Sequence, residues 1–161
     1  MSATQTQQTL SARLADQLLR AAEGDAWHGP ALREVLEDIS AQQAVARPIA
    51  GAHSIREILA HLSAWAVIVR RRLAGEAITE VGPAEDWPAL EIQDGDAWVD
   101  AQRRAVESVR RLARAVGELP DEKLGDRVPG QDYSNDTMLL GALQHTLYHT
   151  GQIAILKKAG A

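Results

Sequence analysis

The stretch Ser54-Ile55-Arg56-Glu57-Ile58-Leu59-Ala60-His61-Leu62 contains the clearest helix start in the chain. Ser54 and Glu57 form a capping box, in which each side chain satisfies a backbone N–H group of the first helical turn. Apolar residues then recur every three or four positions as far as Leu73, and Gly75 ends the pattern. This spacing predicts an amphipathic helix over 54–75, with one face turned toward a core.

The same periodicity predicts three further long helices, over residues 9–22, 94–117 and 135–158. A shorter segment opens at Gly29-Pro30, with Pro30 in its first turn, and continues to Ile39. Residues 76–93 and 118–135 contain several prolines and glycines and are typical of long connections. These features predict an all-α protein: one four-helix-bundle domain over 1–161, with long connections after the second and third long helices.

Composition and charge exclude several classes of function. The 161 residues include 17 basic and 22 acidic side chains, a formal charge of -5, which argues against a nucleic-acid-binding face. Cysteine is absent, which excludes disulfides, a cysteine nucleophile and thiolate metal ligands. The first residues lack the basic start and apolar core of a signal peptide, and no apolar run approaches the roughly 20 residues that span a bilayer. We therefore expect a cytoplasmic protein without nucleic-acid or membrane partners.

Two of the five histidines stand four residues apart, as His145 and His149. On a helix these positions share one face, so both imidazoles can reach one metal ion. No charged residue occurs between Asp136 and Lys157, which predicts a mostly buried helix. Buried imidazoles need polar partners, and a shared cation would supply one for each. A chance or surface pair is the alternative interpretation.

The other three histidines have different surroundings. His61 lies in the middle of the apolar pattern of 54–75; alone it would be a core residue, but beside the pair it is a third candidate ligand. His53 precedes the capping serine and either lines a substrate or cofactor entrance or is simply a polar residue outside the helix. His28 lies in a break between helices, as a loop residue or at the rim of a pocket built from residues 24–30 and 76–93.

Three further residues are candidates for a catalytic role. Glu57, one turn before His61, could accept a hydrogen bond from the second nitrogen of a ligand histidine, although its capping position favours a structural role. Gln152 and Tyr148 could orient water or substrate, or could equally be packing residues. Thr146 follows His145 where H-E-x-x-H proteases have glutamate, which disfavours that class.

Together with Trp27-His28-Gly29 and with the segment from Gln144 to Ile153, the stretch from His53 to Leu62 resembles the DinB-like (DinB/YfiT-like) metalloenzyme superfamily. The likeness covers nearly the whole chain. It implies an up-down-down-up bundle with a three-histidine site for a divalent metal, commonly nickel or zinc. The matching ligands are His61, His145 and His149. His53 departs from the family pattern, which often has tryptophan there.

The resemblance also bears on activity and assembly. Characterised relatives include thiol transferases that use bacillithiol, mycothiol or similar cofactors, and a mycothiol-dependent maleylpyruvate isomerase. We therefore expect a metal-dependent thiol S-transferase or hydrolase acting on small electrophilic molecules. Any thiol must come from a low-molecular-weight cofactor, because the chain has no cysteine. Family members often pair, which implies a homodimer. The alternative is a non-catalytic, stress-associated bundle that binds a ligand or acts as a dimeric interaction protein.

Overall fold

Helix α4 (Ile55–Leu73) begins at the predicted capping box. Ser54 is its N-cap residue, and the Glu57 carboxylate accepts a hydrogen bond from the backbone nitrogen of Ser54 at 2.7 Å. Three arginines occupy the last turn, where positive charge complements the helix dipole. Local sequence signals therefore mark both ends of this helix.

The computed structural model describes residues 8–160, and within that range it contains helices but no β-strand. The long helices besides α4 are α1 (Leu10–Glu23), α6 (Gly95–Gly117) and α7 (Asn135–Ala159). The short elements are α2 (Leu32–Leu36), α3 (Ala41–Val45), α5 (Pro83–Asp86) and a 3-10 turn (Asp121–Lys123). The all-α prediction is confirmed. Residues 1–7 and 161, which the predicted single domain includes, lie outside the described residues.

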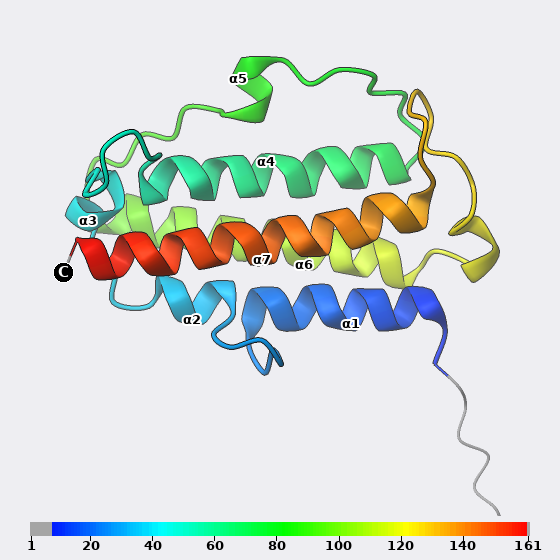
Figure 1. The fold of residues 1–161 in the computed structure, drawn as a ribbon, viewed down its shortest axis with the longest axis horizontal. Helices are drawn as coiled ribbons and strands as arrows, with labels where there is room; N and C mark the ends of the chain where they lie inside the picture. The colour runs from blue at the N-terminus through cyan, green and yellow to red at the C-terminus, as the bar shows by residue number, and fades with distance from the viewer. Residues whose placement is uncertain (1–7, 161) are drawn as a thin grey trace, which may run out of the picture.

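The four long helices lie side by side in an up-down-down-up order (Figure 1). Helices α6 and α7 each pack against both α1 and α4. Because α4 and α6 run in the same direction, the chain between them must return along the whole bundle, and it carries α5 across the outer side of α4 (Figure 1). This return explains the length of the connection after α4.

One cluster of buried apolar residues draws on all four long helices and on α2 and α3. Trp98 of α6 is its largest fully buried side chain, and its indole N–H donates to the backbone oxygen of Ile39 at 2.6 Å. The chain after α2 is thereby tied to the bundle by both apolar contact and a hydrogen bond.

The short elements differ from the prediction for residues 30–39. Pro30 is not in the first turn of α2, because Ala31 is the N-cap residue and the Glu34 carboxylate accepts a hydrogen bond from its backbone nitrogen. The helix also ends at Leu36, before Ile39. Helices α3 and α5 lie in stretches where the sequence predicts no helix, and each is too short to show a clear apolar period.

Helix α7 is less buried than its uncharged sequence predicts. Leu140, Tyr148 and Ile155 are exposed along one side of it, with exposed fractions of 45%, 64% and 61%. None of the helices in residues 8–160 combines the length and apolar character needed to cross a membrane.

Candidate metal centre

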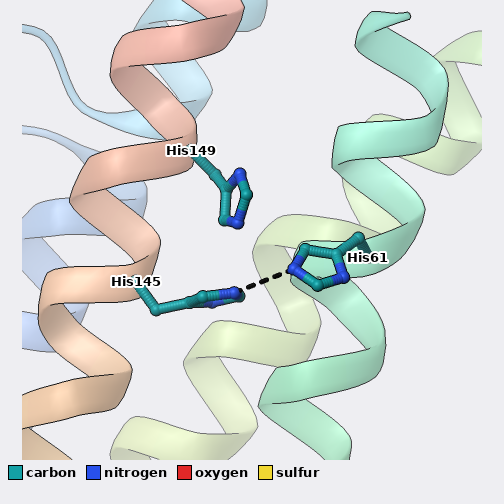
Figure 2. Close-up of side chains that lie close together, drawn as sticks. All are labelled: His61, His145 and His149. Atoms are coloured by element: carbon teal, nitrogen blue, oxygen red, sulfur yellow. Dashed lines mark hydrogen bonds between the residues drawn. The ribbon is translucent and has the colours of Figure 1, made fainter. Parts of the chain in front are cut away.

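Three histidines from two helices meet in the space between α4 and α7. His61 projects from α4, and His145 and His149 project from successive turns of α7, so that the three rings point toward one another (Figure 2). One ring nitrogen from each lies within 4.8 Å of the others. The Nε2 atoms of His61 and His145 are 3.0 Å apart. We call these three residues the histidine triad.

Hydrogen bonds at the outer nitrogens decide which tautomer two of the rings adopt. The Nδ1 atom of His61 lies 2.8 Å from the backbone oxygen of Asp86, and that of His149 lies 2.7 Å from Oε1 of Gln152. Since both partners are acceptors, each Nδ1 carries the proton and each Nε2 keeps a free lone pair. Both lone pairs lie on the inner side of the triad, where a shared metal ion would bind them.

Desolvation favours the neutral form of the two histidines on α7. Desolvation, with a smaller effect of His149 and His61, lowers the pKa of His145 to about 4. Burial also lowers the pKa of His149, although its hydrogen bond with Gln152 opposes the shift. Neutral imidazoles with a free inner lone pair are the donor set that nickel, zinc and similar divalent ions prefer. His61 and His149 present this form, and His145 would present it once the proton of its hydrogen bond with His61 moved from Nε2 to Nδ1, so the three residues fit such an ion.

The connection between α4 and α6 supplies two neighbours of the triad that the sequence analysis missed. The Asp86 carboxylate accepts a hydrogen bond from Nε1 of Trp65 at 2.7 Å and lies 3.2 Å from Nδ1 of His61. The Trp87 ring stacks on His61 at 4.0 Å between centroids and on His53 at 3.7 Å. One sequence feature could have pointed to them: an acidic residue followed directly by an aromatic one, at the end of the short helix that begins at Pro83.

Two cavities meet the triad, and His61 and His145 line both. The Arg72 cavity, of about 480 Å³, extends toward the end of α4, where Arg72 and Tyr133 line it. The His53 cavity, of about 560 Å³, lies toward the beginning of α4. Its walls include His53, Trp87, Tyr148, His149 and Gln152. The triad is therefore accessible from two different spaces.

The structure separates the three candidate catalytic residues. Glu57 bonds to Ser54 and to Arg47, and the carboxylate beside His61 is that of Asp86 instead. Glu57 is held back at the helix start because its capping hydrogen bonds point it away from the following turn. Gln152 contacts the triad directly, through His149. Tyr148 is exposed at the rim of the His53 cavity, with its ring 5.1 Å from that of His149.

The two candidate cofactor-binding histidines lie in different parts of the molecule. His53 lines its cavity and stacks on Trp87. His28 is exposed in the connection between α1 and α2, which lies on the opposite side of the bundle from α5 (Figure 1). Residues 24–30 line neither cavity, whereas Asp86 and Trp87 from the segment 76–93 do. The adjacency of α4 to α7 rather than to α1 explains the difference.

An all-helical bundle with a histidine triad between two long helices defines a class of proteins able to hold a metal ion. The family model described as the DinB superfamily matches residues 25–153, and the chain belongs to this superfamily. A crystal structure of a conserved protein from Enterococcus faecalis is similar in fold, with a TM-score of 0.60 and 14% sequence identity. That alignment covers 99% of this chain and 97% of the other. None of the curated proteins matches this chain.

Proposed function

We propose that this protein is a metal-dependent enzyme that transfers a low-molecular-weight thiol to a small electrophilic molecule. The histidine triad would hold one divalent ion, nickel or zinc. The observation that carries the proposal is the position of the triad between two cavities, because His61 and His145 line both. Two spaces that meet at one centre suit two reactants of different shape.

A divalent ion at this centre supplies Lewis acidity, which lowers the pKa of a thiol or of water toward neutrality. The protein itself orients the ligand imidazoles and shields them from water. Gln152 and the backbone of Asp86 hold two imidazole tautomers, and Trp87 covers one face of His61. In the transfer, the thiol proton passes to solvent, a carbon–sulfur bond forms, and the bond from that carbon to its leaving group breaks. In the hydrolase alternative, water takes the place of the thiol.

The test combines elemental analysis with a turnover assay. Protein purified without a nickel-binding tag is compared with His61→Ala and with His28→Ala, a matched control because His28 is exposed and outside both cavities. Turnover is followed with 1-chloro-2,4-dinitrobenzene and with cysteine or glutathione as the thiol. We expect about one divalent ion per chain in the wild type and in the control, and loss of both metal and turnover in His61→Ala.

The outcomes separate the alternatives. Turnover that survives complete metal removal would contradict a metal-dependent mechanism. Consumption of an ester or amide substrate without any thiol would favour the hydrolase. An ion that binds at one per chain without turnover of any electrophile would favour a non-catalytic bundle.

A specific observation supports a second candidate function, that of a dimeric interaction protein. The exposed side chains Leu140, Tyr148 and Ile155 form an uncharged apolar stripe on α7, and such stripes mark association surfaces. We propose that two copies of the chain pair along this stripe. Light scattering would give twice the chain mass for the wild type and a single chain mass for Ile155→Glu, whereas a wild-type monomer would contradict the pairing.

A further inference from the structure

Arg72 is a buried positive charge near the end of α4. Its exposed fraction is 5%, and within residues 8–160 no carboxylate oxygen lies within 4 Å of its guanidinium nitrogens. It donates hydrogen bonds to the hydroxyl of Tyr133 at 2.9 Å and to the backbone oxygen of Ile78 at 3.0 Å. Its Nε atom is buried and has no hydrogen-bond partner in the part of the chain that the structure describes. The charge is therefore held by neutral acceptors alone.

Such an arrangement is costly for a purely structural residue. A guanidinium has five N–H groups in a planar fork, and here only two of the side chain's hydrogen bonds find protein acceptors. Removing an ion from water without an opposite charge carries a desolvation penalty that neutral hydrogen bonds repay only in part. The ring of Trp65, whose centroid is 5.8 Å from Cζ of Arg72, offers some compensation. A complementary anion is still missing.

The location of Arg72 relates this charge to the triad. Arg72 and His61 line the same cavity of about 480 Å³. They are eleven residues apart on α4, which is about three helical turns or roughly 16 Å along one face. The walls between them are largely apolar, formed by Leu62, Ala66, Val69, Leu112, Met138 and Ala142. The Asp86 carboxylate stands at the triad end, beside His61.

Trp65 connects the two ends of this cavity. Its indole N–H is bound to Asp86 near the triad, and its ring lies beside the Arg72 guanidinium. The cavity thus offers a cation at one end, an apolar middle, and the triad at the other. A ligand that matches this sequence has an anionic group, an apolar body and a reactive group.

We propose that Arg72 binds the carboxylate of the substrate, so that the preferred substrates are small apolar carboxylic acids that carry their electrophilic group away from the carboxylate. The reactive end of this assignment rests on the proposed function; the binding of the carboxylate does not. A single planar guanidinium matches a singly charged, planar carboxylate in a bidentate manner. A phosphate dianion would leave charge unmatched in an apolar cavity that presents one arginine.

The test is calorimetric titration of the metal-free protein with 4-phenylbutyrate and with its neutral analogue 4-phenylbutanamide. Omitting the metal removes the triad as an anion site, so a failed proposal for the enzyme does not affect the result. We expect the wild type to bind the carboxylate at least about tenfold more tightly than the amide, since hydrogen bonds to charged groups are the stronger class. Arg72→Gln should lose this preference. Arg70→Gln removes an exposed charge two residues earlier and should keep it.

Equal affinities of the wild type for both compounds would overturn the proposal. So would a preference that appears only after zinc is added and persists in Arg72→Gln, because the carboxylate would then bind at the triad. If Arg72→Gln fails to fold, the wild type provides its own test by NMR. The Nε–H resonance of Arg72, assigned with Arg72→Lys, should move downfield with 4-phenylbutyrate and stay unchanged with the amide; an unmoved resonance would contradict carboxylate binding there.

Discussion

Gln152 provides the sharpest test of how the triad is organised. Its Oε1 lies 2.7 Å from Nδ1 of His149, and His149 is buried, with an exposed fraction of 6%. Gln152→Ala removes this acceptor and leaves the ring free to place its proton on either nitrogen. Every molecule with the proton on Nε2 lacks the lone pair that a metal needs. Zinc affinity should therefore fall although no ligand has been changed.

The structure sets the size of this effect. Replacing an outer partner of a metal-binding histidine typically costs 10–100-fold in affinity. We expect a loss at the lower end of this range, about tenfold or about 1.4 kcal/mol, because burial still holds the orientation of the His149 ring when its proton is free to move. The assay is a competition titration of zinc against a chromophoric chelator at pH 7.5.

Gln144→Ala is the matched control, because Gln144 is an exposed glutamine on the same helix and lines neither cavity. Circular dichroism of the metal-free variants checks that both keep the wild-type fold. If Gln152→Ala binds zinc as tightly as Gln144→Ala, the tautomer argument is wrong and Gln152 is a packing residue. Gln152→Glu, which keeps an acceptor at this position, should retain most of the affinity.

Three further predictions concern stability. Unfolded imidazoles take up protons below about pH 6.5, whereas His145 and His149 of the folded protein stay neutral to lower pH because desolvation lowers their pKa values. The metal-free protein should therefore lose stability in urea titrations as pH falls from 6.5 toward 4, by about 2 kcal/mol after allowance for solvent. An increase over this range would contradict the lowered pKa values. Trp98→Phe strands the backbone oxygen of Ile39 and should cost about 1–3 kcal/mol in the same titrations, and a neutral outcome would show that water replaces the indole. Ser54→Ala should cost about 1 kcal/mol by removing the cap of α4, whereas Ser54→Thr, which keeps the capping hydroxyl, should cost less.

The spacing of apolar residues was sufficient to predict the long helices because amphipathic periodicity and capping are local properties. Ser54 and Glu57 mark the start of α4 in the sequence as they do in the structure. The pairing of His145 with His149 is equally local, since any helix places residues four apart on one face. The approach of His61 to this pair is a tertiary event. Its place in the apolar pattern of 54–75 made it a third candidate ligand, and the resemblance to a family pointed to the same residue.

Asp86 and Trp87 show what local reasoning could not reach. They lie in a connection with no apolar period, and they meet His61 only because α4 and α6 run in the same direction and force the chain back across α4 (Figure 1). Glu57 was the nearer carboxylate in the sequence, but its capping hydrogen bonds hold it at the helix start. Distance along the chain was therefore a poor guide to the neighbours of the triad.

The sequence by itself determined the helical class, the approximate bounds of four long helices and the shared helix face of His145 and His149, because each depends on residues within a few turns of one another. The tertiary structure alone decided that the triad lies between two cavities, that Asp86 and Trp87 adjoin it, and that Arg72 is buried with no carboxylate of residues 8–160 beside it. These features depend on which helix faces are brought together and on the path of the connections, and no short stretch of sequence specifies either.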